Sequence, residues 1–319
     1  MKRFQCKDCF QWFSIDHRVK NHSVIEDHID GKPIRKIADK EGKSKSSINR
    51  KLAEQIKKLP HNNSVTKRYC NRFCGIMVVD GKYVKVRGYE KAIPLLWGID
   101  YLTHDLPVFD LAPSENYESW LKFFGYLKSI NYPLQIVVCD DNENIKIAAE
   151  YMFPNVLIQT CQNHFLENIR RDLQVRTEEK YRWFVLDLKR ELFSKKITRE
   201  NFQHNALKLL KKYTGNDVAV NCLVKIEKYF NELTAATLVP GAPRDTNLIE
   251  LYNSHLQARL KSIKGFKSFG SAERWLNAYI LRRRFRKFRD CSRKFRYLNG
   301  KTSISQTCKK NGDLPLLFI

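Results

Sequence analysis

No stretch of the sequence is apolar for long enough to cross a membrane, because a spanning helix needs about 20 consecutive, mostly apolar residues. Hydrophobic residues make up 43% of the 319 residues, but charged residues interrupt them throughout. The first residues are charged and include cysteines, so the apolar core and small-residue cleavage site of a secretory signal are missing as well. We therefore expect neither a membrane protein nor a secreted one. The length suits one large core with one or two small appendages.

Acidic residues are scarce at both ends of the chain, whose total net charge is +24. Residues 1–70 hold 17 Lys or Arg against 8 Asp or Glu, and residues 251–319 hold 17 against 3, which gives +9 and +14. Only +1 is left for residues 71–250. Two basic ends around a near-neutral centre suit a protein that grips a polyanion, because each neutralised phosphate releases counterions. A merely solubilising surface, the alternative, needs far less charge.

Closely spaced cysteines are also few, although the chain has nine cysteines. An odd number without a secretory signal indicates reduced thiols in a cytosol. The one close pair, Cys6 and Cys9, lies in a cysteine- and aromatic-rich element over residues 1–22, and its spacing is typical of a zinc-binding knuckle. The spacing of Cys9, Phe13, His22 and His28 also approximates that of a Cys2His2 finger. His28 falls in a predicted helix, however, which weakens that interpretation.

Residues 23–60 have the pattern of a helix-turn-helix unit. Apolar residues recur at helical spacing, and turn signals at 30–33 and 42–44 divide the segment into three helices. Ser44 is a good N-cap for a last, recognition helix at about 44–57. The side chains of that helix suited to phosphates and base edges are Ser46, Ser47, Asn49, Arg50 and Lys51. We predict DNA binding here, and an ordinary three-helix bundle with a solvated basic face is the alternative.

The pattern from residue 70 to residue 160 predicts an α/β core. After a polar linker at 59–64, strands are expected at 76–79, 83–86, 94–101 and 106–111, with a turn at Asp80-Gly81-Lys82. A helix at 115–130, a strand at 134–139, a helix at 142–152 and a strand at 156–160 follow. This alternation favours partly parallel pairing. Residues 161–240 are almost wholly helical and too long for a loop, so we expect an inserted helical domain before the final helices at 241–300.

Three carboxylates stand where a metal site can be built. Asp80 and Asp140 each end an apolar strand, which would hold a carboxylate rigidly at the edge of a sheet. Glu250 lies on a helix whose apolar stripe packs on the core, so the glutamate can point across the same edge. Taken singly, each is weak evidence, because an Asp after a strand is as often a turn or helix cap. Together they can hold two Mg²⁺ or Mn²⁺ ions about 3.5–4 Å apart, which suits in-line displacement at a phosphodiester.

Four motifs in order resemble the DDE transposases of bacterial insertion sequences and the eukaryotic Mutator-like elements: VDGKYV at 79–84, VCDD at 138–141, CQNH at 161–164 and NLIELYN at 247–253. The resemblance covers about residues 80–300. It implies an RNase H-like core interrupted by a helical insertion, with Asp80, Asp140 and Glu250 as the catalytic, metal-binding carboxylates. The aspartates are 60 positions apart, and 110 positions separate Asp140 from Glu250, which leaves room for the insertion.

One position departs from the commonest pattern of that family. Asp141 stands where the family often has glycine or another small residue, so Asp140 and Asp141 are both candidate ligands. We favour Asp140 because it directly follows the apolar run.

The resemblance also implies an activity and partners. The activity is metal-dependent DNA cleavage and strand transfer of an insertion sequence, in the cytoplasm of a bacterium or archaeon and close to its nucleoid. DNA is the partner, as element ends and target, and a homodimer or higher oligomer is expected because two element ends must be held together. A catalytically inactive DNA-binding derivative is one alternative, although all three carboxylates are present. An RNase H-like nuclease without strand transfer is another, although it would have less need of a helix-turn-helix.

Two cysteine motifs have more than one interpretation. Cys161 and His164 match a Cys-x-x-His motif of the family, and one helical turn would place both on one face near the carboxylates. There they either bind zinc with distant partners or pack and orient a DNA phosphate. For Cys6 and Cys9, the resemblance suggests the second half of a zinc ribbon whose first cysteine pair would lie upstream of Met1.

Residues 268–297 form a strongly basic amphipathic stretch, followed by a tail at 301–319. Nine cations occur in the 15 positions from 282 to 296, with almost no acidic residue among them. Such cations repel one another unless phosphate is near, although a solvated face is the usual explanation for a charge run. We assign contact with the DNA backbone to Arg282, Arg283, Arg284, Arg286, Lys287 and Arg289.

Overall fold

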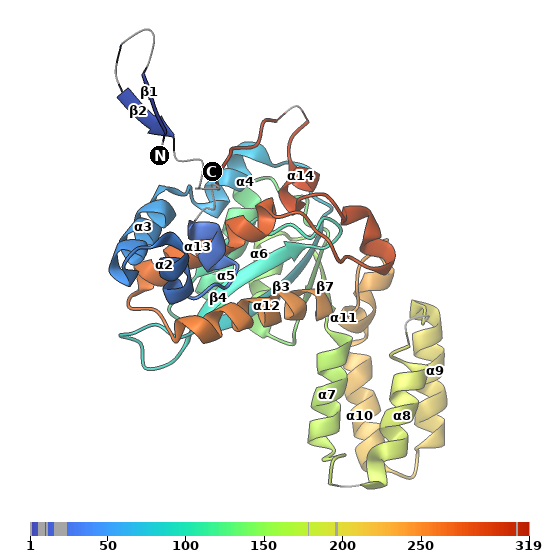
Figure 1. Ribbon diagram of the computed structural model, residues 1–319. Coiled ribbons are helices and arrows are strands. Elements are labelled where there is room, and N and C mark those ends of the chain that lie inside the picture. Colours follow the sequence, from blue (N-terminus) through green and yellow to red (C-terminus); the bar gives the residue numbers. More distant parts are fainter. Residues whose placement is uncertain are drawn as a thin grey trace.

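A five-stranded mixed sheet lies at the centre of the computed structural model, which describes residues 2–5, 10, 12–15, 24–177, 179–194, 197–310 and 312–318 (Figure 1). Its strands are, in spatial order, β5 (Phe109–Leu111), β4 (Ile93–Asp100), β3 (Ile76–Val84), β6 (Ile136–Cys139) and β7 (Leu157–Thr160). The pairs β3–β4 and β4–β5 are antiparallel, whereas β6 runs parallel to β3 and β7. This order places β3 and β6 side by side. β3 carries Asp80, and β6 ends one residue before Asp140.

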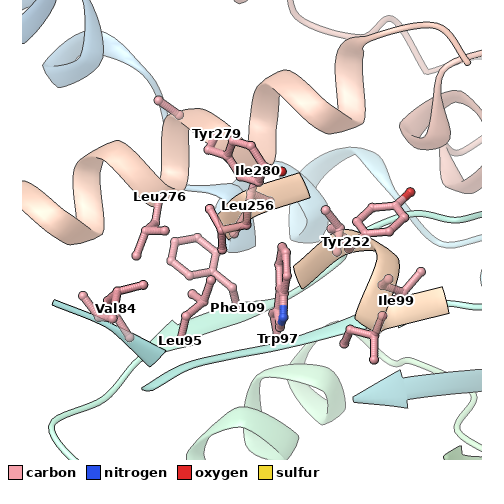
Figure 2. Packing of buried hydrophobic residues seen from close by; sticks show 14 of the residues in the cluster. Val84, Leu95, Trp97, Ile99, Phe109, Tyr252, Leu256, Leu276, Tyr279 and Ile280 are labelled. Atoms are coloured by element: carbon pink, nitrogen blue, oxygen red, sulfur yellow. The ribbon is translucent and has the colours of Figure 1, made fainter. Parts of the chain in front are cut away.

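Helices cover both faces of this sheet. They are α5 (Tyr117–Ser129) and α6 (Glu143–Met152) on one face, and α12 (Asn247–Ile263) and α13 (Phe269–Phe285) on the other. Successive side chains of a strand point to opposite faces. Met77 and Val79 therefore join the core under α5 and α6, whereas Ile76 and Val78 join the core under α12 and α13. Figure 2 shows the second core, in which Trp97 of β4 lies among side chains of the two helices.

Three helices lie where the sequence predicts the helix-turn-helix: α1 (Val24–Ile29), α2 (Ile34–Glu41) and α3 (Lys45–Lys58). Gly42 ends α2 in the left-handed conformation, with φ at 61°. The Ser44 side chain then accepts a hydrogen bond from the Ser47 backbone N–H at 3.2 Å and caps α3, as predicted. Ile37 and Ile48 are buried in the same core as α12 and α13. The unit thus packs directly on the body of the protein.

The linker predicted at residues 59–64 is wrong, because a helix, α4 (Asn62–Tyr69), begins within it. Asn62 is fully buried, and its Nδ2 donates to the backbone oxygens of Leu106 at 3.0 Å and Pro107 at 3.2 Å. Its backbone N–H donates to Oδ1 of Asn277 on α13 at 2.7 Å. Asn62, one of the polar residues that suggested a linker, is therefore buried and hydrogen-bonded to segments distant in sequence, which local patterning does not reveal.

The turn predicted at Asp80-Gly81-Lys82 is also wrong. An Asp-Gly pair favours a two-residue hairpin turn, but β3 continues through these residues. They pair with residues 95–97 of β4, and the ladder between the two strands extends to Val84 and Ile93. The neighbouring strand thus satisfies the backbone without a turn, and Asp80 lies within β3 instead of at its end.

A bundle of helices is inserted between β7 and α12. It contains α7 (Gln162–Asp172), η1 (Glu179–Tyr181), α8 (Arg182–Glu191), α9 (Arg199–Lys212), α10 (Asp217–Lys228), α11 (Phe230–Thr234) and η2 (Ala235–Thr237). Figure 1 shows α7 to α10 extending away from the sheet, and the bundle has a hydrophobic core of its own. Gln159 of β7 fastens it to the sheet, because its Nε2 donates to the Leu233 oxygen at 3.2 Å and its Oε1 accepts from the Ala236 N–H at 2.7 Å.

Short elements lie at the two ends of the chain. Near the N-terminus, β1 (Lys2–Gln5) pairs antiparallel with β2 (Trp12–Ile15), and Cys6 and Cys9 of the predicted zinc knuckle lie outside the described residues. After α13 come η3 (Arg293–Leu298) and α14 (Ser303–Thr307). Within the described ranges, no helix combines the length and apolar character needed to span a bilayer.

Candidate active site

Asp80 lies on β3 and Asp140 directly follows β6, at matching positions of two neighbouring parallel strands. Val78 of β3 and Val138 of β6 are partners in the register, and each aspartate follows its valine by two residues. Burial and then the negative charge of Asp140 raise the pKa of Asp80 to about 7. The two carboxylates are therefore close enough to repel each other, and a cation between them would relieve that repulsion.

Helix α12 brings Glu250 to the same site and holds Asp80. Asn253, one helical turn after Glu250, donates from Nδ2 to Oδ2 of Asp80 at 2.5 Å. Its Oδ1 accepts a hydrogen bond from Trp97 Nε1 at 3.1 Å, which fixes the orientation of the amide. Thr246 precedes the helix and donates from Oγ1 to Oε1 of Glu250 at 2.8 Å. Both acidic groups are thus positioned by neighbouring polar side chains.

His164 connects Asp140 with Glu250. Its Nδ1 lies 2.5 Å from Oδ1 of Asp140, and its Nε2 lies 3.7 Å from Oε1 of Glu250. The hydrogen bond with Asp140, followed by that with Cys161, raises the pKa of His164 to about 11. The imidazole is therefore cationic at neutral pH and offsets part of the negative charge of the carboxylates. The Cys-x-x-His motif thus lies at the carboxylates, as its position after β7 predicts.

Cys161 is buried at the start of α7, beside the same carboxylates. Its Sγ accepts hydrogen bonds from the backbone N–H of Thr246 at 3.4 Å and from the Thr246 hydroxyl at 3.3 Å. Cys161, His164 and Asp140 each offer one possible metal-ligand atom, and the three atoms lie within 4.8 Å of one another. Sulfur, nitrogen and oxygen ligands of this kind suit zinc, although only a neutral imidazole can bind it, so zinc would have to displace the proton of His164. A structural zinc site has four protein ligands and a catalytic site has three.

The three predicted carboxylates fit a divalent metal. Asp80, Asp140 and Glu250 supply the hard oxygen ligands that Mg²⁺ and Mn²⁺ prefer. The side chains of Asp140 and Glu250 are 42% and 43% exposed, so water and substrate can reach them. Burial and then the charge of Asp140 raise the pKa of Asp80, and a bound cation would favour its ionised form.

Asp141, the second candidate at the end of β6, has a different partner. Its Oδ1 accepts a hydrogen bond from Lys146 Nζ at 2.5 Å. Lys146 is almost fully buried and also contacts Glu143 at 3.1 Å and Glu232 of α11 at 2.7 Å. Asp141 is therefore engaged in an ion-pair network between the core and the insertion, whereas Asp140 faces His164.

Glu115 is a further acidic residue of this region that the sequence analysis missed. It accepts hydrogen bonds from Tyr83 Oη at 2.7 Å, Asn142 Nδ2 at 3.0 Å and Trp120 Nε1 at 3.2 Å. Its charge also contributes to the raised pKa of Asp80. A Cβ at position 81 would lie 2.5 Å from its Oε2, so Gly81 is needed for this close approach. Glu115 lies in a loop outside every motif, and only the fold brings it to Asp80.

The predicted recognition helix exposes most of the residues assigned to DNA. Ser46, Asn49 and Arg50 are exposed on α3, and Ser47 and Lys51 are half-buried. Their side chains lie on the surface, so the prediction of DNA contact stands as a prediction.

The basic stretch predicted at residues 268–297 consists of a helix and an irregular segment. α13 ends at Phe285, and the segment after it is irregular up to η3. Arg286, Lys287 and Arg289 are exposed there. Arg282 instead donates to Glu26 and, at 2.8 Å, to Asp30, and so ties α13 to the end of α1.

Arg283 and Arg284 also have roles within the protein. Arg283 is half-buried, and its guanidinium carbon lies 4.7 Å from the centre of the Tyr252 ring. Arg284 is fully buried, and Nη2 donates to Oδ2 of Asp105 at 2.7 Å. The assignment of Arg284 to DNA is therefore wrong for this structure. Spacing alone placed it in the charge run, whereas its helical position points it into the core.

Together these features define a class of protein. It is a mixed α/β protein with carboxylates on two adjacent central strands and on a late helix, interrupted by a helical insertion. Residues 25–286 match the family described as "Transposase, Mutator family", so the chain belongs to the Mutator family of transposases. The family predicted from the four motifs is thereby confirmed. Membership implies polynucleotidyl transferase activity, DNA binding and use of a divalent metal.

Two curated relatives agree with this family. The chain is similar to the transposase for insertion sequence element IS256 in transposon Tn4001 of Staphylococcus aureus and to the protein of the same description from Enterococcus faecalis. It is 25% identical to each over 287 residues, which cover 85% of this chain and 72% of the relative.

Proposed function

We propose that this chain catalyses the cleavage and strand transfer of DNA at the ends of an insertion sequence, with Asp80, Asp140 and Glu250 as its catalytic carboxylates. The observation that carries the proposal is that each carboxylate is held by a polar neighbour, Asp80 by Asn253, Asp140 by His164 and Glu250 by Thr246, and that His164 contacts both Asp140 and Glu250. The aspartates are 60 positions apart and Glu250 is 110 positions after Asp140, so their attachment to shared neighbours supports a common site on a core that we propose to be RNase H-like.

The catalytic carboxylates would hold Mg²⁺ or Mn²⁺. Such ions stabilise charge on phosphoryl oxygens and lower the pKa of bound water or of a DNA 3′-hydroxyl. Asn253 orients Asp80 and Thr246 orients Glu250, so the carboxylates need little rearrangement to bind the metal. His164 holds Asp140 through Nδ1. Cleavage and strand transfer are both in-line displacements at phosphorus, so one such site serves both steps.

The remaining parts of the chain would bind DNA and a second copy. We assign base and phosphate contacts to α3, and backbone contacts to Arg286, Lys287 and Arg289, which are exposed. A homodimer or higher oligomer follows from the need to hold two element ends at once. We also propose that Cys6 and Cys9 bind zinc and contribute to DNA recognition.

The test is an assay of cleavage and strand transfer on DNA that carries the ends of the element, with Mg²⁺ or Mn²⁺. The variants are Asp80→Asn, Asp140→Asn and Glu250→Gln, and Asp141→Asn is the matched control beside the site. We expect each of the three variants to lose activity by at least about 100-fold while DNA binding persists, and the control to keep activity within a few-fold.

Other outcomes identify the alternatives. A parent protein that binds the ends but cuts with neither metal is a DNA-binding derivative of a transposase. One that cuts but never joins strands is a nuclease. Activity that survives Asp140→Asn and is lost in Asp141→Asn assigns the second ligand to Asp141.

A further inference from the structure

A cavity of about 600 Å³ lies beside the catalytic helix, between α12, α13 and the segment that follows α13. None of the three catalytic carboxylates lines it. Part of its wall is apolar, with Leu248, Leu251 and Phe288, and Leu251 is 51% exposed. The cationic part of the wall consists of Arg259, Arg282, Arg283, Arg286, Lys287 and Arg289. This size is within the usual range for sites that bind small organic groups, roughly 300–1,000 Å³.

Three buried polar atoms without a partner belong to side chains that line this cavity. In the described ranges five buried side-chain atoms lack a hydrogen-bond partner, and three of them belong to residues of this wall: Tyr279 Oη, His104 Nε2 and Arg283 Nε. Tyr279 is 3% exposed and His104 is 7% exposed. Leaving such groups unpaired is costly, and native proteins rarely do so unless a ligand or water completes them. Their concentration in one cavity indicates a polar ligand.

The charge of the wall indicates that this ligand is an anion. The two acidic residues of the wall are Asp30 and Asp290, and Asp30 is already engaged by Arg282 at 2.8 Å. In the part of the chain that the structure describes, Arg259, Lys287 and Arg289 form no ion pair. Burial raises the pKa of Tyr279, so its hydroxyl remains a donor at neutral pH.

The walls also hold the unpaired side chains in place. The Tyr279 ring stacks on Trp275 with a centroid distance of 5.7 Å and an interplanar angle of 11°. His104 has a left-handed backbone, with φ at 56°, and its ring lies 4.3 Å from that of Phe295. Burial and then the charges of Arg283 and Lys294 lower the pKa of His104 to about 4, so its imidazole is neutral. A preformed site of this kind loses little entropy when it binds.

We propose that this cavity binds one nucleotide of the DNA strand held at the catalytic site, with its phosphate at Tyr279 and Arg283 and its base against Leu251 and Phe288. The inference rests on the proposed function, since that function supplies the DNA. A cavity of this volume with an apolar wall exceeds the needs of a phosphate ion alone. His255 and Ala258 of the wall follow Glu250 on α12 by five and eight residues, or about 8–12 Å along the axis. This is the separation along the axis only, because at helical spacing these residues lie on the opposite flank of α12 from Glu250 and Asn253. The strand would therefore pass around α12 to reach the cavity, and the bound nucleotide would lie several positions from the bond that is cut.

Tyr279→Phe is the sharpest test, because it removes one unpaired hydroxyl and keeps the buried ring. The measurement is the affinity of the full chain for DNA carrying an element end, without a catalytic metal. A hydrogen bond to a charged phosphate is worth about 1.5–3 kcal/mol, so we expect roughly tenfold or greater weakening. Tyr151→Phe, which removes an exposed hydroxyl on α6, should leave the affinity unchanged. Equal affinity of Tyr279→Phe and the parent would overturn the proposal.

Neutral methylphosphonate linkages then locate the nucleotide. Placed one at a time along the strand, one of them should weaken binding by the parent and remove the difference between the parent and Tyr279→Phe. If no position does so, but millimolar inorganic phosphate protects the parent from unfolding and does not protect Tyr279→Phe, the cavity binds a free anion and the proposal fails.

This binding test is separate from the test of catalysis. Tyrosine-dependent binding by a protein that cuts with neither metal would support the cavity and refute the proposed reaction. Normal cleavage by the parent together with unchanged DNA binding by Tyr279→Phe would support the proposed reaction and refute the role of the cavity.

Discussion

Arg284 and Asp105 form an ion pair that has no access to solvent. Both side chains are fully buried, and the guanidinium donates to the carboxylate at 2.7 and 2.8 Å. Thr307 and Ser303 donate to the same carboxylate at 2.6 and 3.0 Å, and Asn62 Oδ1 accepts from Arg284. Taking two charges out of water is costly, and complete hydrogen bonding offsets that cost. The pair therefore joins α13, α14, α4 and the turn after β4 into one unit.

Removing one partner should be strongly destabilising. We expect Arg284→Met to lower the free energy of unfolding by about 3–5 kcal/mol, because the Asp105 charge is left buried and unpaired. Burial alone would raise the pKa of Asp105, but Arg284 and the hydrogen bonds hold it below its ordinary value. A depressed pKa gives stability that is present above about pH 4 and is lost as the pH falls through the folded-state value.

Urea unfolding of the parent and Arg284→Met between pH 7 and pH 3 checks this prediction. The difference between the two proteins should narrow as the pH falls from 7, because burial raises the pKa of the unpaired Asp105 in the variant and its protonation removes the buried charge. Below about pH 4 the parent loses its own contribution from the ion pair, and the difference narrows further. Arg286→Met is the control, because Arg286 is half-exposed and 3.5 Å from Asp30, and should cost less than about 1 kcal/mol. A difference that stays constant down to pH 3 would show that the lost stability comes from packing alone.

At the scale of elements, α11 is attached to the core by a lysine. Lys146 on α6 contacts Asp141 at 2.5 Å and Glu232 on α11 at 2.7 Å, and its side chain is 5% exposed. Thr160 of β7 donates to Glu232 as well, at 2.7 Å. The attachment lies directly beside Asp140 and His164. The insertion and the active site therefore share one set of contacts.

Lys146→Met should loosen this attachment. It leaves two carboxylates near each other without their cation, and we expect a loss of about 2 kcal/mol together with faster amide hydrogen exchange in α11 and at the start of α7. Lys225→Met is a suitable control, because its pair with Asp172 is exposed, and it should change stability by less than about 0.5 kcal/mol. Unchanged exchange in α11 would mean that Gln159 and the apolar contacts hold the insertion without Lys146.

Elements with a periodic apolar pattern could be predicted from the sequence. The core helices α5 and α6 and the strands β4, β6 and β7 lie close to the predicted bounds, and the described part of residues 161–240 is largely helical, because burial imposes a period of 3.6 or 2. The failures were at segments whose structure is set by distant partners. Asp80-Gly81 remains in a strand because β4 pairs with it, and Asn62 begins a helix because its amide is bound by a remote loop.

The residues of the candidate site also fall into those that could be predicted from the sequence and those that could not. Asp80, Asp140 and Glu250 could be predicted because each has a recognisable position on a strand or helix, and the order of motifs links them. Glu115 could not, because nothing in its own segment distinguishes it from a surface residue. Likewise, the sequence does not distinguish Arg284, which is buried, from the exposed Arg286 two residues later.

At the scale of the whole molecule, positive charge is concentrated at the two ends of the chain. The net charges of +9 over residues 1–70 and +14 over residues 251–319 flank a nearly neutral centre. The fold brings parts of these ends together, since α1 and α3 pack against α13. The three N-terminal helices and the basic segment after α13 are thus attached to the same helix, and we predict that one DNA duplex contacts both.

The salt dependence of DNA binding measures this combined surface. Each neutralised phosphate contributes about −0.9 to the slope of log affinity against log salt concentration. Replacing Arg286, Lys287 and Arg289 together by Gln should therefore make the slope shallower by about 2.7. The matched control replaces Lys189, Lys208 and Lys211, three exposed cations of the insertion, by Gln and removes the same charge from the chain.

The slopes of the two triple variants distinguish attraction by the net charge of the whole protein from direct contact of the segment after α13 with DNA. If net charge alone attracts DNA, both triple variants lose the same amount of slope, because each lowers the charge by three. If the segment after α13 lies on the DNA backbone, only its own variant loses about 2.7, since counterions are released only where a phosphate is neutralised. Equal slopes for the two variants would remove this segment from the DNA interface and leave α3 as its main predicted contact.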